Sequence, residues 1–311
     1  MKPYYETKLG KLYHGNVSDV LPQLESESVQ MCVTSPPYWG LRDYGVDGQF
    51  GLEKTPEEYT EKMVQVFREV KRVLRGDGTL WLNLGDSYAG GGTGGHIDNK
   101  ASVIEKAPSH NVVKTLKPKD LCGIPWRVAF ALQADGWYLR QDIIWHKPNP
   151  MPESVKDRCT KAHEYMFLMS KNGRYYYDAD AVREADNPDG RKQTVRKQTN
   201  RYNDNMLNTF QDQEHERWTG SRNRRSVWRI PTHSYSEAHF ATFPPKLIEP
   251  CIFAGSREGD VVLDPFGGAC TTPLVCEKYS RRWVAAEISE EYCEISAKRI
   301  ESEASQLKLW G

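Results

Sequence analysis

The chain has 311 residues, enough to bury a large core in one or two domains, and 42 basic side chains balance 42 acidic ones. A formal net charge of zero excludes a global basic field, so any surface for a polyanion has to be local. The seven cysteines are odd in number and form no C-x-x-C pair, which argues against a disulfide framework and a zinc knuckle. The N-terminal residues lack the apolar core of a signal peptide, and no apolar run approaches membrane-spanning length. We therefore expect a cytoplasmic protein without a membrane partner.

The first residues predict a strand, a helix and a second strand. The strands correspond to 11–16 and 29–35, and the helix to 17–24. The run VQMCV is apolar throughout rather than alternating, which is typical of a parallel strand buried on both faces.

A long amphipathic helix follows, from Thr55 to Leu74. Thr55 is a predicted N-cap, Pro56 suits the first turn, and Glu58 completes a capping box. One helix face carries four apolar residues, Met63, Phe67, Val70 and Leu74. Residues 76–86 then form a turn and another buried strand.

Strands and helices are also predicted in the rest of the chain, separated by irregular segments. Strands are predicted at 137–147, 163–171, 259–264 and 281–289, and helices at 243–256, 273–280 and 290–305. Strands that alternate with helices indicate an α/β fold with a doubly wound, mainly parallel sheet and right-handed crossovers. The glycine-rich connection from 87 to 119 is expected to be a mobile loop.

Residues 178–235 differ in composition from the rest of the chain. They are polar, show little periodicity, and are rich in Arg, Lys, Asn and Gln. One interpretation is a solvated or disordered insertion. The other is a segment that faces nucleic acid, because basic and amide side chains alternate with Tyr202, Phe210 and Trp218.

A glycine turn follows the strand VVLD, where Gly267 and Gly268 lead from Asp264 into a helix. Glycines allow close backbone approach, and amides at a helix start favour polar or anionic groups. Glu287 ends the next strand, at a spacing suited to accepting hydrogen bonds from ribose hydroxyls. A structural turn with a surface glutamate is the alternative. The pattern G-x-G-x-x-G is missing, which disfavours a hydride-transfer enzyme.

The motifs TSPPYW and VVLDPFGGACTT together resemble those of the amino-methylating DNA methyltransferases. That family transfers a methyl group from S-adenosylmethionine to N4 of cytosine or N6 of adenine. The motif order is similar to the family's β-type permutation, with the catalytic loop first, a variable region, and the cofactor turn last. Further matches, in order along nearly the whole chain, are HGN, GTLWLNLGDS, DIIWHKPNP and HFATFPPKLIEP.

The resemblance implies a circularly permuted, Rossmann-like methyltransferase fold. The chain would begin at the third strand of the usual fold and supply the first two strands at its C-terminal end. Residues 1–177 would be the catalytic half of the methyltransferase domain, 178–235 a target-recognition insert, and 236–311 the cofactor-binding half. The implied partner is double-stranded DNA, with a cognate restriction endonuclease as an optional second partner. Both a monomer and a homodimer stay open.

The resemblance also assigns catalytic roles to the SPPY loop. Ser35 Oγ and the Pro36 carbonyl would accept hydrogen bonds from the exocyclic amine, making its nitrogen more nucleophilic. Pro36 and Pro37 fix φ and remove amide donors, so the carbonyl direction is preset. Tyr38 would stack on a base turned out of the duplex, because the target atom is unreachable within the stack.

Cofactor contacts are implied at nine positions spread over both motifs. They are Asn16, Thr34, Phe243, Asp264, Pro265, Phe266, Gly267, Gly268 and Glu287. Two positions depart from the family pattern: Asn16 stands where an aspartate is frequent, and Cys270 where a second glycine is usual. No metal is required by a sulfonium methyl donor, and none is expected.

The target base is left open between two choices. Ser35 in the first position of the motif favours N4 of cytosine, and N6 of adenine is the alternative because adenine enzymes with serine also occur. Methylation of RNA or protein amides, and a catalytically silent DNA-binding regulator, are further alternatives. C5 methylation of cytosine needs a cysteine nucleophile, which Cys251 could supply, but that residue lies inside a helical pattern.

Basic residues that could contact DNA phosphates are few and scattered. Lys147 follows the strand pattern DIIWH, and Arg222, Arg224 and Arg225 form a local cluster. Each could equally be solvated or structural. Such contacts would set affinity, whereas base readout requires other side chains.

Overall fold

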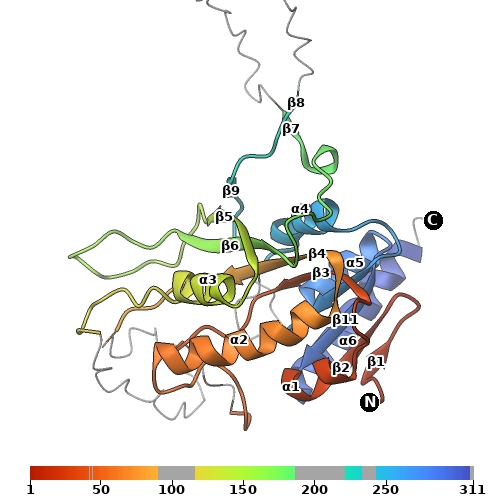
Figure 1. The fold of residues 1–311 in the computed structure, drawn as a ribbon, viewed down its shortest axis with the longest axis horizontal. Helices are drawn as coiled ribbons and strands as arrows, with labels where there is room; N and C mark the ends of the chain where they lie inside the picture. Colours follow the sequence, from red (N-terminus) through yellow and green to blue (C-terminus); the bar gives the residue numbers. More distant parts are fainter. Residues whose placement is uncertain (42, 44, 90–115, 186–220, 233–242, 309–311) are drawn as a thin grey trace, which may run out of the picture.

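A mostly parallel sheet organises the part of the chain that the structure describes, residues 1–41, 43, 45–89, 116–185, 221–232 and 243–308 of this computed structural model. Within these residues nine strands form one sheet in the order β1-β2-β11-β10-β3-β4-β6-β5-β9 (Figure 1). The strands are β1 (Tyr5–Glu6), β2 (Gly10–His14), β3 (Val29–Thr34), β4 (Leu74–Leu84), β5 (Tyr138–His146), β6 (His163–Ser170), β9 (Val227–Arg229), β10 (Val261–Asp264) and β11 (Arg282–Glu287). Parallel pairing runs from β2 through β11, β10 and β3 to β4, and β6 lies antiparallel between β4 and β5.

Helices cover both faces of the sheet, each over its own apolar cluster (Figure 1). On one face lie α1 (Val17–Val20), α2 (Pro56–Val73) and α3 (Ile124–Ala134). On the other lie α4 (Pro245–Gly255), α5 (Thr271–Lys278) and α6 (Glu290–Lys308). Short 3-10 turns occur at Leu21–Gln23 and Asp180–Val182. The doubly wound architecture predicted from the sequence is therefore confirmed.

The predicted start of the long helix is confirmed at the level of hydrogen bonds. Thr55 caps α2, because its hydroxyl accepts the Glu58 amide at 3.1 Å. The Glu58 carboxylate returns to the amide of Lys54 at 3.1 Å, one residue before the position that a standard capping box uses. The buried face of α2 includes Met63, Phe67 and Val70, as the spacing indicates.

The sheet order also bears out the permutation. The N-terminal strand β2 lies beside β11, which lies beside β10, so the last two strands of the chain occupy the middle of the sheet. The chain leaves β3 for β4 across the face that α2 covers, whereas it leaves β10 for β11 across the face that α5 covers. Strand order therefore reverses between β3 and β10, the place where ligands bind in open α/β sheets.

The region expected to be the target-recognition insert contributes to the sheet as well. β9 pairs in parallel with the end of β5, and β7 (Glu184–Ala185) pairs with β8 (Ser221–Arg222) in a separate two-stranded ribbon. This ribbon extends away from the sheet at the top of Figure 1. β9 thus belongs to the sheet although it lies within residues 178–235. The rest of the insert (186–220), the glycine-rich loop (90–115) and residues 233–242 lie outside the described residues. No helix of the described chain is long and apolar enough to cross a membrane.

A close approach at the first parallel pair gives a test of the packing. A Cβ added at Gly10 would lie 2.1 Å from the Trp283 indole, which is 1% exposed and anchored to Glu277 at 2.7 Å. We expect Gly10→Ala to lower the free energy of unfolding by about 1–3 kcal/mol, because a rigid buried ring has to shift. Urea unfolding measures this. Gly76→Ala is the control, since its Cβ meets only ordinary contact at 3.8 Å, and equal stability of the two variants would contradict the prediction.

Candidate active site

The two motif loops meet through one buried hydrogen bond. Thr34 at the end of β3 donates its hydroxyl to Asp264 Oδ1 at the end of β10, at 2.7 Å. Both residues are almost completely buried. Ser35 and Pro265 are the next residues of the two strands, so the SPPY loop and the cofactor turn begin side by side at the reversal of strand order.

The glycine turn is held by backbone bonds to the neighbouring strand. The Gly267 amide donates to the Ala286 carbonyl and the Gly268 amide to Glu287 Oε2, both at 2.7 Å. Glu287 accepts a second amide, that of Ser289, at 2.8 Å. These bonds fix the carboxylate that was predicted to meet ribose hydroxyls, directly beside the turn. Burial raises its pKa, and the amide bonds oppose this.

Cys270 occupies an unusual backbone position where the family has glycine. It has φ of +52° at the residue before α5, and its thiol is completely buried. A Cβ at Gly267 would lie 3.3 Å from the Cys270 sulfur and 3.2 Å from the Ala286 carbonyl oxygen, so a larger residue at 267 would fit only if these neighbours shifted slightly. Burial raises the pKa of the Cys270 thiol, which makes it a packing group and not a reactive one.

The remaining predicted cofactor residues have the following surroundings. Asn16 caps α1 through the Ser18 amide at 2.9 Å and donates to the Gly48 carbonyl at 3.0 Å. Phe266 is half-buried and meets Phe50 edge to face, with ring centroids 5.6 Å apart. Pro265 is buried within the turn. Phe243, also half-buried, packs against the cluster under α4.

The residues at the turn fit a cationic nucleoside. Asp264 Oδ1 accepts the Thr34 hydroxyl and, at 3.2 Å, the Phe266 amide. Oδ2 of the same carboxylate is buried without a hydrogen bond of normal geometry in the described residues, although the nearby Thr272 hydroxyl lowers the pKa of the carboxyl. Gly268 has φ of +51°, and a Cβ there would meet nothing within 4 Å, which leaves room next to the backbone. An unsatisfied carboxylate oxygen and an open glycine suit the positively charged end and the close approach of S-adenosylmethionine.

The prolines of the SPPY loop are held from beneath by α2. Pro36 is buried, and the Tyr59 hydroxyl donates to the Pro37 carbonyl at 2.9 Å. Among the described residues no donor reaches the Pro36 carbonyl. The next residue after the motif, Trp39, is 2% exposed and donates its indole N–H to the Glu53 carbonyl at 2.9 Å. The loop is therefore rigid, with the Pro36 acceptor available.

The Tyr38 ring lies close to Gly85 and is anchored through its hydroxyl. A Cβ at Gly85 would lie 2.5 Å from the ring atom Cε2. The hydroxyl donates to Glu164 Oε2 at 2.8 Å, lies 3.1 Å from Asn83 Oδ1, and accepts from Ser35 Oγ at 3.4 Å. Burial and the nearby Glu164 raise the pKa of Tyr38 well above its usual value, so the phenol stays protonated.

Two lysines flank Glu164 at the same edge. Lys147 Nζ forms an ion pair with Glu164 Oε1 and lies 4.3 Å from the centroid of the Trp145 ring. The Lys161 amine is buried without a hydrogen-bond partner in the described chain, and burial lowers its pKa. Lys147, predicted to contact DNA phosphate, is thus placed at the catalytic edge and paired there.

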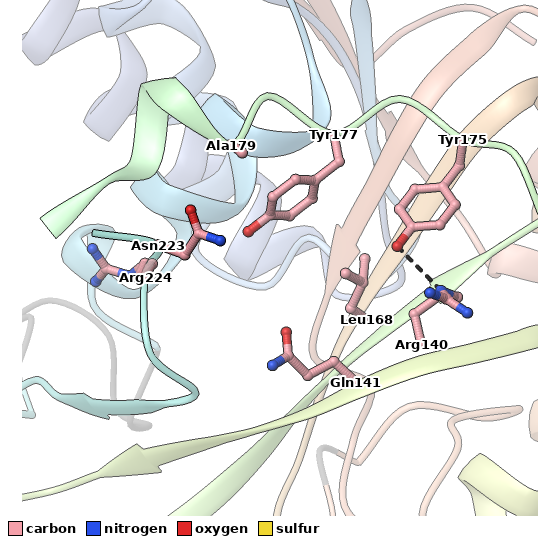
Figure 2. A pocket seen from close by; sticks show the side chains of 8 residues that line it. All are labelled: Arg140, Gln141, Leu168, Tyr175, Tyr177, Ala179, Asn223 and Arg224. Atoms are coloured by element: carbon pink, nitrogen blue, oxygen red, sulfur yellow. Dashed lines mark hydrogen bonds between the residues drawn. The ribbon is translucent and has the colours of Figure 1, made fainter. Parts of the chain in front are cut away.

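The arginine cluster lies elsewhere. Arg222 and Arg225 both pair with Glu184 of the β7–β8 ribbon, and Arg224 stacks on Trp228 with its guanidinium 4.7 Å from the ring centroid. Arg224 also lines a hollow of about 350 Å³ with Arg140, Gln141, Leu168, Tyr175, Tyr177, Ala179 and Asn223 (Figure 2). Arg140 and Gln141 belong to the first half of β5, at the end remote from Lys147. The structure therefore does not bring Arg224 to the catalytic loop.

The cysteine needed for C5 methylation is not available. Cys251 is completely buried in α4 and donates its S–H to the Leu247 carbonyl at 3.5 Å. Burial raises the pKa of this thiol, whereas a nucleophilic cysteine needs a lowered one. No group of three His, Cys, Asp or Glu suited to a metal ion occurs among the residues that the structure describes.

Comparison with known proteins agrees with the two motif loops. The DNA methylase model of the N6/N4 methyltransferases matches residues 29–298. The chain belongs to this family. It is 46% identical over 293 residues to the Type II methyltransferase M.Cfr9I of Citrobacter freundii, covering 94% of this chain and 88% of that protein. It is 47% identical over 299 residues to M.XycI of Xanthomonas campestris pv. cyanopsidis, covering 95% and 89%.

Solved structures show the same fold for this methyltransferase. The cytosine-N4-specific PvuII DNA methyltransferase superposes with a TM-score of 0.66 at 20% identity, over 98% of this chain and 95% of that one. A putative DNA modification methylase from Thermus thermophilus, in complex with S-adenosyl-L-methionine, gives a TM-score of 0.59 at 22% identity, with 95% of each chain covered. At these identities the likeness establishes the Rossmann-like methyltransferase fold.

Four residues of the methyltransferase site were missed by the sequence analysis. Asn83 and Glu164 bind the Tyr38 hydroxyl, Tyr59 holds the Pro37 carbonyl, and Gly85 makes room for the Tyr38 ring. Asn83 carried a usable signal, because it is a polar residue inside the otherwise apolar run LWLNL. Glu164 carried none, since its position depends on the register of an antiparallel strand.

The contact between Gly85 and Tyr38 gives a second test. We expect Gly85→Ala to reduce methyl transfer at least about tenfold, because the added methyl group displaces the Tyr38 ring from its anchored position. Transfer of labelled methyl groups to DNA measures the loss, and thermal unfolding verifies that the variant is folded. Gly173→Ala is the control, with its Cβ at 3.6 Å from the Tyr138 ring. Full activity of Gly85→Ala would contradict the assigned packing.

The buried Asp264 carboxylate gives a third test. Burial raises its pKa from 3.8 to about 7, so the folded protein holds this proton more tightly than the unfolded chain. The contribution of Asp264 to stability is then full below about pH 4 and is lost as the pH rises through about 7. We expect the stability of the wild type relative to Asp264→Asn to fall by about 2–3 kcal/mol between pH 5 and pH 8. Urea unfolding without cofactor measures it, and a pH-independent difference would contradict it.

Proposed function

We propose that the protein transfers a methyl group from S-adenosylmethionine to N4 of a cytosine within a specific sequence of double-stranded DNA. The observation that carries the proposal is the Thr34–Asp264 hydrogen bond, which joins the SPPY loop to the cofactor turn. Because both loops open at the reversal of strand order, a cofactor at the turn has its reactive end facing Ser35.

The residues of the loop supply what an amine nucleophile needs. The cofactor, when bound, supplies an electrophilic methyl group on a sulfonium. Ser35 Oγ and the Pro36 carbonyl accept the two amine N–H bonds, and Tyr59 keeps the loop in place through the Pro37 carbonyl. Tyr38 offers a ring face to the extruded base, and Gly85 leaves room for the ring. Alignment of the amine with the methyl group supplies much of the acceleration.

The cofactor residues have matching roles in this proposal. Asp264 Oδ2 faces the positive charge, Glu287 meets the ribose hydroxyls, and Asn16 pairs with the adenine ring. Gly267 and Gly268 permit close approach of the cofactor to the backbone. The side chains that enclose the cofactor are those of Thr34, Phe243, Pro265 and Phe266. Glu287 supports this best, because its carboxylate is held in place by the Gly268 and Ser289 amides.

Cytosine is favoured by the first residue of the loop. Ser35 presents a neutral hydroxyl, and by resemblance to the family this leans towards N4 of cytosine. The PvuII enzyme with the same fold is cytosine-N4-specific. The alternative is N6 of adenine, which the same pair of acceptors would also bind.

DNA contacts are proposed for the basic residues on the insert side. Residues 178–235 form the target-recognition region, in which Arg222, Arg224 and Arg225 meet phosphates on release from their present partners. Lys147 meets a phosphate near the extruded base. Since M.Cfr9I and M.XycI are Type II methyltransferases, we also propose a cognate restriction endonuclease that acts on the same sequence. The enzyme works as a monomer or a homodimer.

Nucleoside analysis tests this proposal. The protein is incubated with labelled S-adenosylmethionine and mixed-sequence duplex DNA, and the DNA is digested and examined by mass spectrometry. We expect N4-methylcytosine, and its loss in Ser35→Ala. N6-methyladenine would overturn the choice of base, and cofactor binding without any methylated nucleoside would favour a silent DNA-binding protein.

A further inference from the structure

A chain of hydroxyl and carboxylate groups leads away from the position of the target amine. Ser35 Oγ donates to the Tyr38 hydroxyl at 3.4 Å, and that hydroxyl donates to Glu164 Oε2 at 2.8 Å. Every donor in the chain points towards Glu164. The first contact is long, which is common for catalytic hydrogen bonds before substrate binds.

Methylation of an amine creates a proton that has to leave. When the N–C bond forms and the C–S bond of the sulfonium breaks, the nitrogen carries a positive charge and an extra proton. Both prolines lack N–H groups, and the Pro36 carbonyl cannot hold a proton. Of the side chains that bind the Tyr38 hydroxyl, Asn83 offers an amide oxygen, which is not a base, whereas Glu164 offers a carboxylate.

We propose that Glu164 accepts this proton through Tyr38 and Ser35. The amine proton passes to Ser35 Oγ, the Ser35 proton to the Tyr38 oxygen, and the Tyr38 proton to Glu164 Oε2. The neutral methylated amine, a neutral Ser35 and Tyr38, and a protonated Glu164 result, so atoms and charges balance. Glu164 then releases the proton to solvent at the partly open edge where it meets Lys147. This role rests on the proposed function.

The charges around Glu164 suit an acceptor that must be ionised before the reaction. Lys147 pairs with it from the residue after β5, and Lys161 lies on the segment before β6. The other ionisable groups at this edge are Asp86 after β4, His146, His163, and Glu153 with its partner Arg158. The side chains of Lys147 and Glu164 are 18% and 15% exposed, which leaves a route for the proton to water.

In this proposal Glu164 acts through Tyr38, so removal of the Glu164 carboxylate should slow only the methyl-transfer step. In single-turnover reactions with excess enzyme, Glu164→Gln should lower the methylation rate about 10²-fold, the typical size of a general-base effect. Glutamine still accepts the Tyr38 bond, so DNA binding should not be weakened, and base extrusion, followed with a fluorescent base analogue, should stay unchanged. The rate of the variant should rise with pH as hydroxide replaces the lost base.

Tyr38→Phe provides the second variant, because it keeps the stacking ring and removes the relay hydroxyl. We expect the same rate loss, and no further loss in the double variant with Glu164→Gln. Glu153→Gln is the matched control, a neighbouring paired carboxylate outside the chain of hydroxyls, and it should retain the wild-type rate. The folded state of each variant is verified by thermal unfolding.

The outcomes separate this proposal from the proposed function. Wild-type protein that yields no methylated nucleoside contradicts the function. Active wild type together with a wild-type rate in Glu164→Gln overturns the relay alone. The relay is also overturned if the rate losses of Glu164→Gln and Tyr38→Phe multiply in the double variant. A loss confined to DNA binding or to base extrusion overturns it as well.

Discussion

The buried hydrogen bond from Thr34 to Asp264 is the contact on which the site depends. It ties the ends of two strands that are 230 residues apart along the chain, one from each half of a permuted domain. Because the bond lies in the core, the SPPY loop and the glycine turn leave the sheet from fixed and adjacent points. A different residue then holds each loop. The Tyr59 hydroxyl donates to the Pro37 carbonyl of the SPPY loop, and the Glu287 carboxylate accepts the Gly268 amide of the glycine turn. The proposed chemistry depends on this placement, since an amine bound at the SPPY loop would face a methyl donor bound at the glycine turn.

The same bond has an electrostatic consequence. Thr34 satisfies one oxygen of Asp264 and leaves the other buried without a hydrogen bond of normal geometry in the described residues, so the carboxylate holds a proton up to about pH 7. Burying this carboxylate in its charged form costs free energy, and a cationic ligand lowers that cost by compensating the charge. The turn is thereby less stable when empty at neutral pH and is expected to tighten with its cofactor. Beside the SPPY loop, by contrast, the carboxylate is already paired, since Glu164 has Lys147 as its counter-ion.

Features encoded locally could be predicted from the sequence, and features set by register could not. The strand at 29–34, the cap at Thr55 and the order of the two motifs each follow from residue patterns, and the motif order implies the sheet order through the rules of parallel crossovers. Glu164 reaches Tyr38 only because β6 runs antiparallel between β4 and β5, which no local pattern reveals. The pairing of Arg222 and Arg225 with Glu184 has the same origin, because it depends on the pairing of β7 with β8, two strands that are distant along the chain. The left-handed conformation of Cys270 could not be predicted either, because residues other than glycine rarely adopt it.

The most direct test of the account is a crystal structure of the protein with a non-reactive S-adenosylmethionine analogue and duplex DNA that contains its target sequence. The account predicts an extruded cytosine on the Tyr38 ring, with its exocyclic nitrogen within hydrogen-bond distance of Ser35 Oγ and the Pro36 carbonyl. The analogue should lie over Gly267 and Gly268 with its reactive end towards that nitrogen. A base bound away from the SPPY loop, or an analogue bound outside the crevice between β3 and β10, would contradict it.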